Sequence, residues 1–237
     1  MYGTQHRDEY VSAFPGFRFT QLMRPRNPIY RVHMHVLFVC NGNVCRSAIA
    51  ERLTRAIAID YRLPGLTAES AGTRALVGFP IEPLAAQTLR GLGGDPEGFR
   101  ARRLAATHVD RADLVLAMTE QIRDQIAVDY GAGARTFTLP QAHRIAKVTG
   151  ARTIAALHAA RNDLSLVGRE NIADPVGLSE AAFCEVGDRI AELLVPLMRA
   201  LAPHEQPVER AHRPRLVVGP SAHARPLPRF MAAQRVG

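Results

Sequence analysis

Residues 36–47 read Val-Leu-Phe-Val-Cys-Asn-Gly-Asn-Val-Cys-Arg-Ser. The four apolar residues at the start predict a buried strand, and the amphipathic stretch 45–61 predicts a helix that begins as the motif ends. A Cys-x5-Arg loop, from Cys40 to Arg46, therefore joins the carboxyl end of a strand to a helix N-terminus. Ligands of open α/β sheets bind at that end of the strands, and a helix N-terminus offers unpaired N–H groups to an anion. This placement predicts a phosphate-binding loop.

The loop combines a nucleophile with an anion clamp. Its N–H groups are expected to surround one tetrahedral anion, with Gly42 permitting the tight backbone path. The same donors stabilise a thiolate at Cys40, and Ser47 is expected to hydrogen-bond that sulfur and ease its departure. Arg46 offers a planar fork to two phosphate oxygens, a geometry that Lys cannot reproduce. The predicted phosphate-binding residues are Asn41, Gly42, Asn43, Val44, Cys45, Arg46 and Ser47.

Apolar runs alternate with amphipathic segments along the chain, which is the pattern of a parallel sheet covered by helices. The predicted fold class is therefore α/β. Strands are predicted at 36–39, 66–70, 113–118 and 135–139, and helices at 45–61, 83–92 and 178–201, with one more helix capped by Thr119. The stretch 141–171 is interpreted as a helical insertion. We expect one domain over residues 34–202.

The chain of 237 residues carries a formal net charge of +8, and its basic residues gather at the two ends. Residues 1–33 hold five Arg against two carboxylates and residues 203–237 hold six Arg against two, which leaves a net charge of about +1 between them. We expect an irregular N-terminal leader at 1–33, with Met34 as an alternative start of translation, and a disordered basic Pro- and Arg-rich tail at 203–237. Nucleic-acid binding by the core is not expected.

Other features of the sequence narrow the class of protein. No window approaches the run of about 18 apolar residues that a membrane span needs, and the N-terminus lacks the layout of a secretory signal, so a cytoplasmic location is predicted.

The three cysteines make a disulfide framework implausible, and reactive thiols are expected. The nine His are scattered without Cys or carboxylate company at ligand spacing, so no metal site is predicted.

The string at 36–47 resembles the signature of the low-molecular-weight protein-tyrosine phosphatases, a flavodoxin-like family. Segments 69–73, 101–104, 112–118 and 174–175 are similar to later family segments in the same order, so the resemblance covers about residues 34–201. It implies a doubly wound four-stranded parallel sheet with helices on both faces, and hydrolysis of phosphotyrosine in proteins through a phosphocysteine intermediate. It also implies that Asn43, Ser47 and Ser70 support the loop, and that Cys45 can form a reversible disulfide with Cys40 under oxidant.

A general acid is expected on a separate segment that reaches over the loop. Asp174-Pro175 is the candidate, because Pro175 biases Asp174 to an extended conformation and the pair precedes the last predicted helix, as in the family. In the resulting mechanism Cys40 attacks phosphorus, Asp174 protonates the leaving oxygen, and Asp174 then activates water. Arg46 and the loop amides carry the transition-state charge, so no metal or other cofactor is required. The expected partner is a phosphotyrosine protein substrate, bound by a monomer or weak dimer.

Departures from the family pattern leave other functions open. Phe99 stands where many members have a His that joins the bracing network. Val44 stands where protein-arginine phosphatases typically have Thr, which favours phosphotyrosine and keeps protein-arginine phosphatase as an alternative. An arsenate reductase of the same fold needs two further cysteines, whereas only Cys184 is left, and we expect Cys184 to lie in the core. A catalytically inactive phosphatase-like binding module with basic tails is the alternative from a different class.

Overall fold

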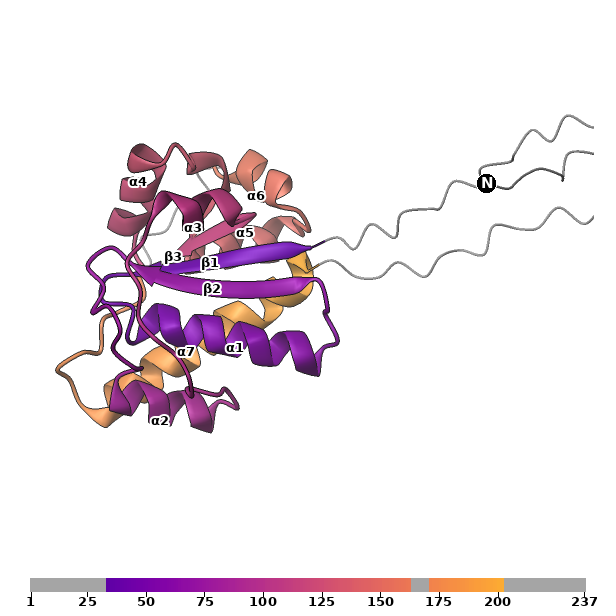
Figure 1. Ribbon diagram of the computed structural model, residues 1–237. Coiled ribbons are helices and arrows are strands. Elements are labelled where there is room, and N and C mark those ends of the chain that lie inside the picture. The colour runs from indigo at the N-terminus through magenta and orange to yellow at the C-terminus, as the bar shows by residue number, and fades with distance from the viewer. Residues whose placement is uncertain (1–32, 163–170, 203–237) are drawn as a thin grey trace, which may run out of the picture. The chain divides into compact units, whose positions relative to one another are not determined.

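The structure is a computed structural model that describes residues 33–162 and 171–202. Four parallel strands form one sheet in the order β2-β1-β3-β4 (Figure 1). The strands are β1 (Met34–Cys40), β2 (Leu66–Gly72), β3 (Leu114–Ala117) and β4 (Thr136–Thr138). The predicted four-stranded parallel sheet is confirmed. The predictions for residues 1–32, 163–170 and 203–237 lie outside the described residues.

Helices cover both faces of this sheet. They are α1 (Arg46–Asp60), α2 (Pro83–Gly91), α3 (Ala106–Arg111), α4 (Glu120–Asp129), α5 (Leu139–Thr149), α6 (Ile154–Ala160) and α7 (Glu180–Leu201), with a short 3-10 helix at Gly133–Arg135. Phe38 of β1 packs in a core with residues of α1, α2, α5 and α7, whereas its neighbour Val39 packs in a second core with residues of α3 and α4. Figure 1 shows α1 and α7 on one side of the sheet and α3 and α4 on the other. The predicted doubly wound arrangement is confirmed.

Local sequence signals set the ends of several helices. The predicted cap Thr119 accepts a hydrogen bond from the N–H of Ile122 at the start of α4, and Thr138 accepts one from Gln141 at the start of α5. Gly150 ends α5 with a left-handed φ of 70°, which costs glycine nothing because it lacks a Cβ. Since α5 begins directly after β4, the strand predicted to reach residue 139 ends at residue 138.

Two further expectations concern the stretch 141–171 and Cys184. In the described part of 141–171, α5 and α6 are helical as predicted, and they bury Ile145 and Leu157 in the main core. Cys184, expected in the core, is exposed. The inward stripe of α7 runs through Phe183, Val186 and Gly187, and helical geometry turns the position after Phe183 toward the surface.

The topology brings two loops to the carboxyl edge of the sheet. β1 ends at Cys40 and α1 begins at Arg46, so the Cys-x5-Arg loop lies at that edge. The N–H of Ile172 donates to the carbonyl oxygen of Met118 at 2.9 Å, directly after β3. Because β1 and β3 are neighbours, the segment that carries Asp174 runs past the end of the strand next to the loop. Within the described ranges no helix is long and apolar enough to cross a membrane.

Candidate active site

The carbonyl groups of the loop after β1 point away from its centre. Those of Cys40, Asn41, Gly42 and Val44 accept hydrogen bonds from N–H groups of the segment 73–82 at 2.9–3.0 Å. A trans peptide holds its N–H opposite to its C=O, so the N–H groups that follow these carbonyls turn toward the inside of the loop. Such a ring of inward donors is what a concave anion site requires.

The N-terminus of α1 adds to this ring. Side chains of Glu82, Thr119, Thr138 and Thr153 cap α2, α4, α5 and α6, but no side chain caps α1, whose N-cap residue is Cys45. The first turn of α1 contains no acidic residue either. Its unpaired N–H groups and the positive end of its dipole therefore favour an anion at the loop.

Two donors of the same loop contact the sulfur of Cys40. The N–H of Asn43 donates to Sγ at 3.3 Å, and Oγ of Ser47 lies 2.9 Å from it. Oγ of Ser47 also accepts a hydrogen bond from Nδ2 of Asn43 at 2.9 Å, so the proton of Ser47 is left for the sulfur. Both contacts favour negative charge on the sulfur.

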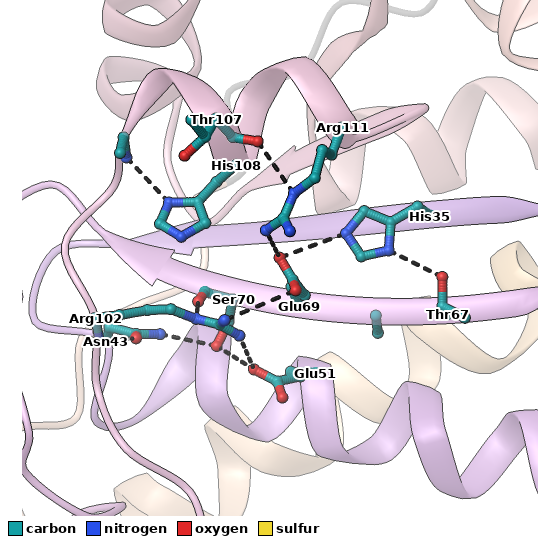
Figure 2. A network of polar contacts seen from close by, with 12 residues as sticks. His35, Asn43, Glu51, Thr67, Glu69, Ser70, Arg102, Thr107, His108 and Arg111 are labelled. Atoms are coloured by element: carbon teal, nitrogen blue, oxygen red, sulfur yellow. Dashed lines mark hydrogen bonds and ion pairs between the residues drawn. The ribbon is translucent and has the colours of Figure 1, made fainter.

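Asn43 makes three side-chain hydrogen bonds behind the loop, and Figure 2 shows the one to Ser70. Its φ of 56° is left-handed, a conformation that Asn adopts more readily than most residues. Its Oδ1 accepts the N–H of Arg102 at 2.8 Å, which fixes the orientation of the amide. Its Nδ2 donates to Oγ of Ser70 at 2.9 Å, as well as to Ser47. The structure thus brings together the three residues predicted to support the loop.

Glu51 of α1 ends this network in the protein interior. Its side chain is 2% exposed, and its Oε2 accepts the hydroxyl of Ser70 at 2.6 Å (Figure 2). Arg55 lies 2.7 Å from Oε1 and Arg102 lies 3.7 Å from Oε2, so two cations compensate the buried carboxylate. Phe99, expected to stand where many family members have a His, has no polar side-chain atom, so it adds no hydrogen bond to this network. The Ser70 hydroxyl donates its hydrogen bond to the Glu51 carboxylate.

Glu51 and Arg102 were not predicted as parts of the site. Glu51 interrupts the apolar period of its helix, so the pattern places it at the surface. The sequence contains one indication of an ion pair at Glu51, because Arg55 follows it by four residues. That spacing is equally typical of exposed ion pairs on helices, so it did not indicate a buried carboxylate.

The glycine that the loop requires is Gly72 of β2 and not Gly42. The backbone of Gly42 is not left-handed, and a Cβ built on it would lie 3.6 Å from Val44 Cγ2, an ordinary contact. A Cβ on Gly72 would lie 2.4 Å from the carbonyl oxygen of Asn41 and 3.0 Å from the backbone nitrogen of Asn43. The prediction that Gly42 permits the tight path is therefore corrected. The left-handed turn falls at Asn43, and the close approach falls at Gly72.

Arg46 connects the loop to the segment that carries Asp174. Its Nη1 donates to the carbonyl oxygen of Ile172 at 3.0 Å, and its Nη2 pairs with Oδ2 of Asp174. Nε of Arg46 is buried and has no hydrogen-bond partner among residues 33–162 and 171–202. The Asp174 side chain is 47% exposed, so solvent reaches the carboxyl group beside Arg46. The structure thus brings the predicted clamp and the predicted general acid into contact.

Cys45 lies among the charges of this site. Burial raises the pKa of its thiol, and the negative charges of Cys40, Asp174 and Glu82 raise it further, while Arg46 lowers it. Cys45 is therefore a neutral thiol near neutral pH. Both Cys40 and Cys45 are buried and free in this structure, and the reversible disulfide between them stays a prediction.

Comparison with known proteins agrees with this geometry. Residues 35–207 match the family described as low molecular weight phosphotyrosine protein phosphatase. The chain belongs to this family. Its fold is shared with a solved low molecular weight protein tyrosine phosphatase from T. tengcongensis, at a TM-score of 0.57 and 28% identity over 71% of this chain and 99% of the other. The YwlE arginine phosphatase from Geobacillus stearothermophilus matches at a TM-score of 0.55 and 29% identity, over 70% of this chain and 91% of the other.

Curated relatives within the phosphatase family carry two activities in their names. The probable low molecular weight protein-tyrosine-phosphatase EpsP of Ralstonia nicotianae is 40% identical over 91 residues, which cover 38% of this chain and 59% of EpsP. Etp of Escherichia coli, also a low molecular weight protein-tyrosine-phosphatase, is 42% identical over 86 residues, 36% of this chain and 55% of Etp. A protein-arginine-phosphatase of Geobacillus stearothermophilus is 37% identical over 107 residues, 45% of this chain and 69% of that protein. The chain thus spans little more than half the length of EpsP and Etp.

Proposed function

We propose that this chain is a cysteine-dependent phosphatase that hydrolyses phosphotyrosine in proteins through a phosphocysteine intermediate. One observation supports this above all. The sulfur of Cys40, contacted by Asn43 and Ser47, shares its loop with Arg46, and Arg46 contacts Asp174. A nucleophile, an anion clamp and a proton donor are thereby available to one substrate phosphate.

The first chemical step forms a bond between the Cys40 sulfur and phosphorus. The sulfur attacks in line with the ester oxygen, the P–O bond breaks, and the leaving oxygen takes the proton of Asp174. The inward N–H groups of the loop and the guanidinium of Arg46 bind the non-bridging oxygens, where the charge of the transition state is spread.

The pairing of Arg46 with Asp174 has a role in this step. A phosphate offers paired oxygens to the guanidinium, as the Asp174 carboxylate does, so we expect the substrate to displace Asp174 from Arg46. The arriving dianion also brings negative charge beside Asp174, which favours the protonated carboxyl that the leaving oxygen requires. Substrate binding thereby frees the acid at the moment it is needed.

The second step returns the enzyme to its starting state. Asp174, now a carboxylate, takes a proton from water, the water oxygen attacks phosphorus, and the S–P bond breaks to release inorganic phosphate. Ser47 and the N–H of Asn43 stabilise the departing thiolate of Cys40. Neither step uses a metal or another cofactor, so we expect full activity in the presence of a metal chelator.

The surroundings of the loop support an aromatic leaving group. Five large apolar side chains from the segments 73–82 and 174–178 are at least half exposed: Leu76, Val77, Phe79, Val176 and Leu178. The first segment is hydrogen-bonded to the loop carbonyls, and the second follows the general acid. A phenyl ring bound between them removes apolar surface from water, which stabilises the complex. The apolar Val44 in the loop supports the same choice.

Two substitutions test the proposal. Cys40→Ser should abolish turnover of a phosphotyrosine peptide and still bind inorganic phosphate, because the N–H ring and Arg46 remain. Asp174→Asn should lower kcat/KM by roughly 10²–10⁴-fold on phenyl phosphate, and by much less on an ester whose leaving group needs no proton, because kcat/KM reports the steps up to release of the leaving group, before Asp174 acts on water. Steady-state rates and phosphate inhibition measure both effects. Comparable turnover by Cys40→Ser, or an equal loss of kcat/KM on both esters in Asp174→Asn, would contradict the mechanism.

Protein-arginine phosphatase is the second candidate, because the relative of that name is matched over 69% of its length. The chemistry of Cys40 and Arg46 would be unchanged, and the leaving atom would be a guanidinium nitrogen. Rates on phosphotyrosine and phosphoarginine peptides of the same sequence decide between the two. We expect phosphotyrosine to be preferred, and Val44→Thr to shift the ratio of rates toward phosphoarginine.

The remaining parts of the proposal concern the whole protein. We place it in the cytoplasm as a monomer or weak dimer that meets phosphotyrosine proteins, with no nucleic-acid partner for residues 34–202. A catalytically inactive binding module remains the alternative from another class. Absence of turnover on every phosphorylated peptide, together with salt-sensitive binding to a polyanion, would favour that alternative.

A further inference from the structure

Two arginines outside the catalytic loop lie directly beside it. The N–H of Arg74 donates to the carbonyl oxygen of Asn41 at 2.9 Å, so its backbone is adjacent to the residue that follows Cys40. Arg103 pairs with Gly72 in a parallel bridge, and its Nη1 donates to the carbonyl oxygen of Thr73 at 3.5 Å. Both side chains thus start from backbone that contacts the rim of the loop.

These two arginines differ from several others in forming no ion pair with a carboxylate among the described residues. Arg55, Arg90 and Arg111 form ion pairs with carboxylates at 2.7–3.0 Å. Arg74 and Arg103 are exposed, and neither pairs with a carboxylate in the described part of the chain. Next to a loop that we propose to bind a phosphate, two cations without a carboxylate partner among the described residues create a positive field that extends beyond the phosphate itself.

We propose that Arg74 and Arg103 select protein substrates with acidic residues next to the phosphorylated side chain. This inference rests on the proposed phosphatase function and adds the chemical class of the flanking sequence. In an extended peptide, the residues one or two positions from the phosphorylated one lie about 3.5–7 Å away along the backbone. With the phosphate in the loop, their side chains come within reach of arginines anchored at Asn41 and Thr73. A carboxylate there accepts the guanidinium fork.

The proposal predicts a measurable preference. Exposed ion pairs contribute little each, so two of them should raise kcat/KM for a peptide with glutamates around phosphotyrosine roughly threefold to tenfold over the same peptide with glutamines. The preference should fall toward one at about 0.5 M salt, because screening shortens the reach of exposed charges. A small aryl phosphate has no flanking residues and reports turnover alone.

The decisive experiment measures the ratio of kcat/KM for the acidic peptide to that for the neutral peptide in each variant. The ratio does not depend on the fraction of active protein, so partial misfolding cannot mimic the effect. The double variant R74E/R103E should lower the ratio to one or below. Arg62→Glu is the charge-matched control for the single variants Arg74→Glu and Arg103→Glu, since exposed Arg62 follows α1, whose 15 residues carry the chain about 22 Å from the loop. It should keep the wild-type ratio.

The outcomes separate the two proposals. A wild-type ratio near one, or an unchanged ratio in R74E/R103E, overturns the role of Arg74 and Arg103 while the phosphatase function stands. An equal fall of the ratio in Arg62→Glu also overturns it, because the effect would then reflect net charge alone. Absence of turnover on the aryl phosphate and both peptides overturns the phosphatase function and this inference with it.

Discussion

At the scale of single residues, Gly72 shapes the catalytic loop without being part of it. A methyl group at this position would lie 2.4 Å from the carbonyl oxygen of Asn41, so the loop must move. A displacement of about 1 Å in a catalytic group can cost on the order of 10²-fold in rate. We predict that Gly72→Ala lowers kcat/KM on an aryl phosphate at least about tenfold and weakens inhibition by inorganic phosphate to a similar degree.

Gly91→Ala is the control for this substitution. A Cβ at Gly91, the last residue of α2, meets no other atom within 4 Å, and its backbone is not left-handed. It should leave both constants unchanged. Similar losses in the two variants would mean that Gly72 affects general stability and not the loop.

The two thiols of the loop should differ in reactivity. Burial raises the pKa of Cys45, so its thiol stays protonated as the pH rises through the neutral range, and thiols react with alkylating agents only as thiolates. Cys40, contacted by Ser47 and the N–H of Asn43, should react. Mass spectrometry after brief treatment with iodoacetamide is expected to show modified Cys40 and exposed Cys184, but not Cys45. Inorganic phosphate should protect Cys40 alone, and a modified Cys45 would contradict the assignment.

The residue types of the loop could be predicted, but their supports could not. Cys40 and Arg46 were identifiable because their chemistry depends on a short spacing at a strand-to-helix junction, which is visible in one dimension. Glu51 and Arg102 are far apart in sequence and meet only through the fold. The close approach of Gly72 to Asn41 likewise joins two different segments of the chain. A pattern of neighbouring residues in the sequence carries no information about contacts between distant segments.

At the scale of elements, the packing of α2 against α7 depends on Gly187. A Cβ on Gly187 would lie 2.3 Å from Cγ2 of Thr88 and 3.2 Å from Cδ1 of Leu92. Alanine favours a helix over glycine by about 1 kcal/mol, but overpacking a core costs about 1–3 kcal/mol. We predict that Gly187→Ala lowers the free energy of unfolding by about 1 kcal/mol, measured by denaturant titration.

The double variant with Thr88→Ser identifies the cause. Serine lacks the Cγ2 methyl group, so the nearest clash at Gly187→Ala disappears. The double variant should be more stable than Gly187→Ala, with an interaction energy of about 0.5–3 kcal/mol. If the effects of the two substitutions on the free energy of unfolding are additive, then the methyl groups at positions 88 and 187 do not clash.

Physical reasons explain which helices and strands could be predicted from the sequence and which could not. The apolar run of β3 is buried on both faces, so four consecutive apolar residues identified it. α3 was missed because its six residues are too few for a helical period to repeat. α5 and α6 lie in a stretch predicted to be helical, but sequence alone does not tell whether an amphipathic face is buried against its own domain, as theirs are.

At the scale of the whole molecule, the strand order explains why distant residues form one site. The order β2-β1-β3-β4 places β1 and β3 side by side, and successive connections leave them in opposite directions. Such a switch point opens a crevice at the carboxyl ends of the two strands. The loop of Cys40 leaves the end of β1, and the segment of Asp174 passes the end of β3 through the bond from Ile172 to Met118. The topology therefore makes the encounter of Arg46 with Asp174 possible.

The same reasoning gives a prediction about the limits of the catalytic unit. In the part of the chain that the structure describes, residues within 34–202 form both hydrophobic cores and the contacts of the site described above. We predict that a chain cut to residues 34–202 folds and hydrolyses an aryl phosphate with kcat/KM within about threefold of the full chain, because these residues bury two hydrophobic cores and hold the site. Thermal unfolding and steady-state kinetics of the two chains measure this. A loss of about tenfold or more with cooperative unfolding retained would show that a terminal segment acts in the reaction itself, because the fold would then be intact without it.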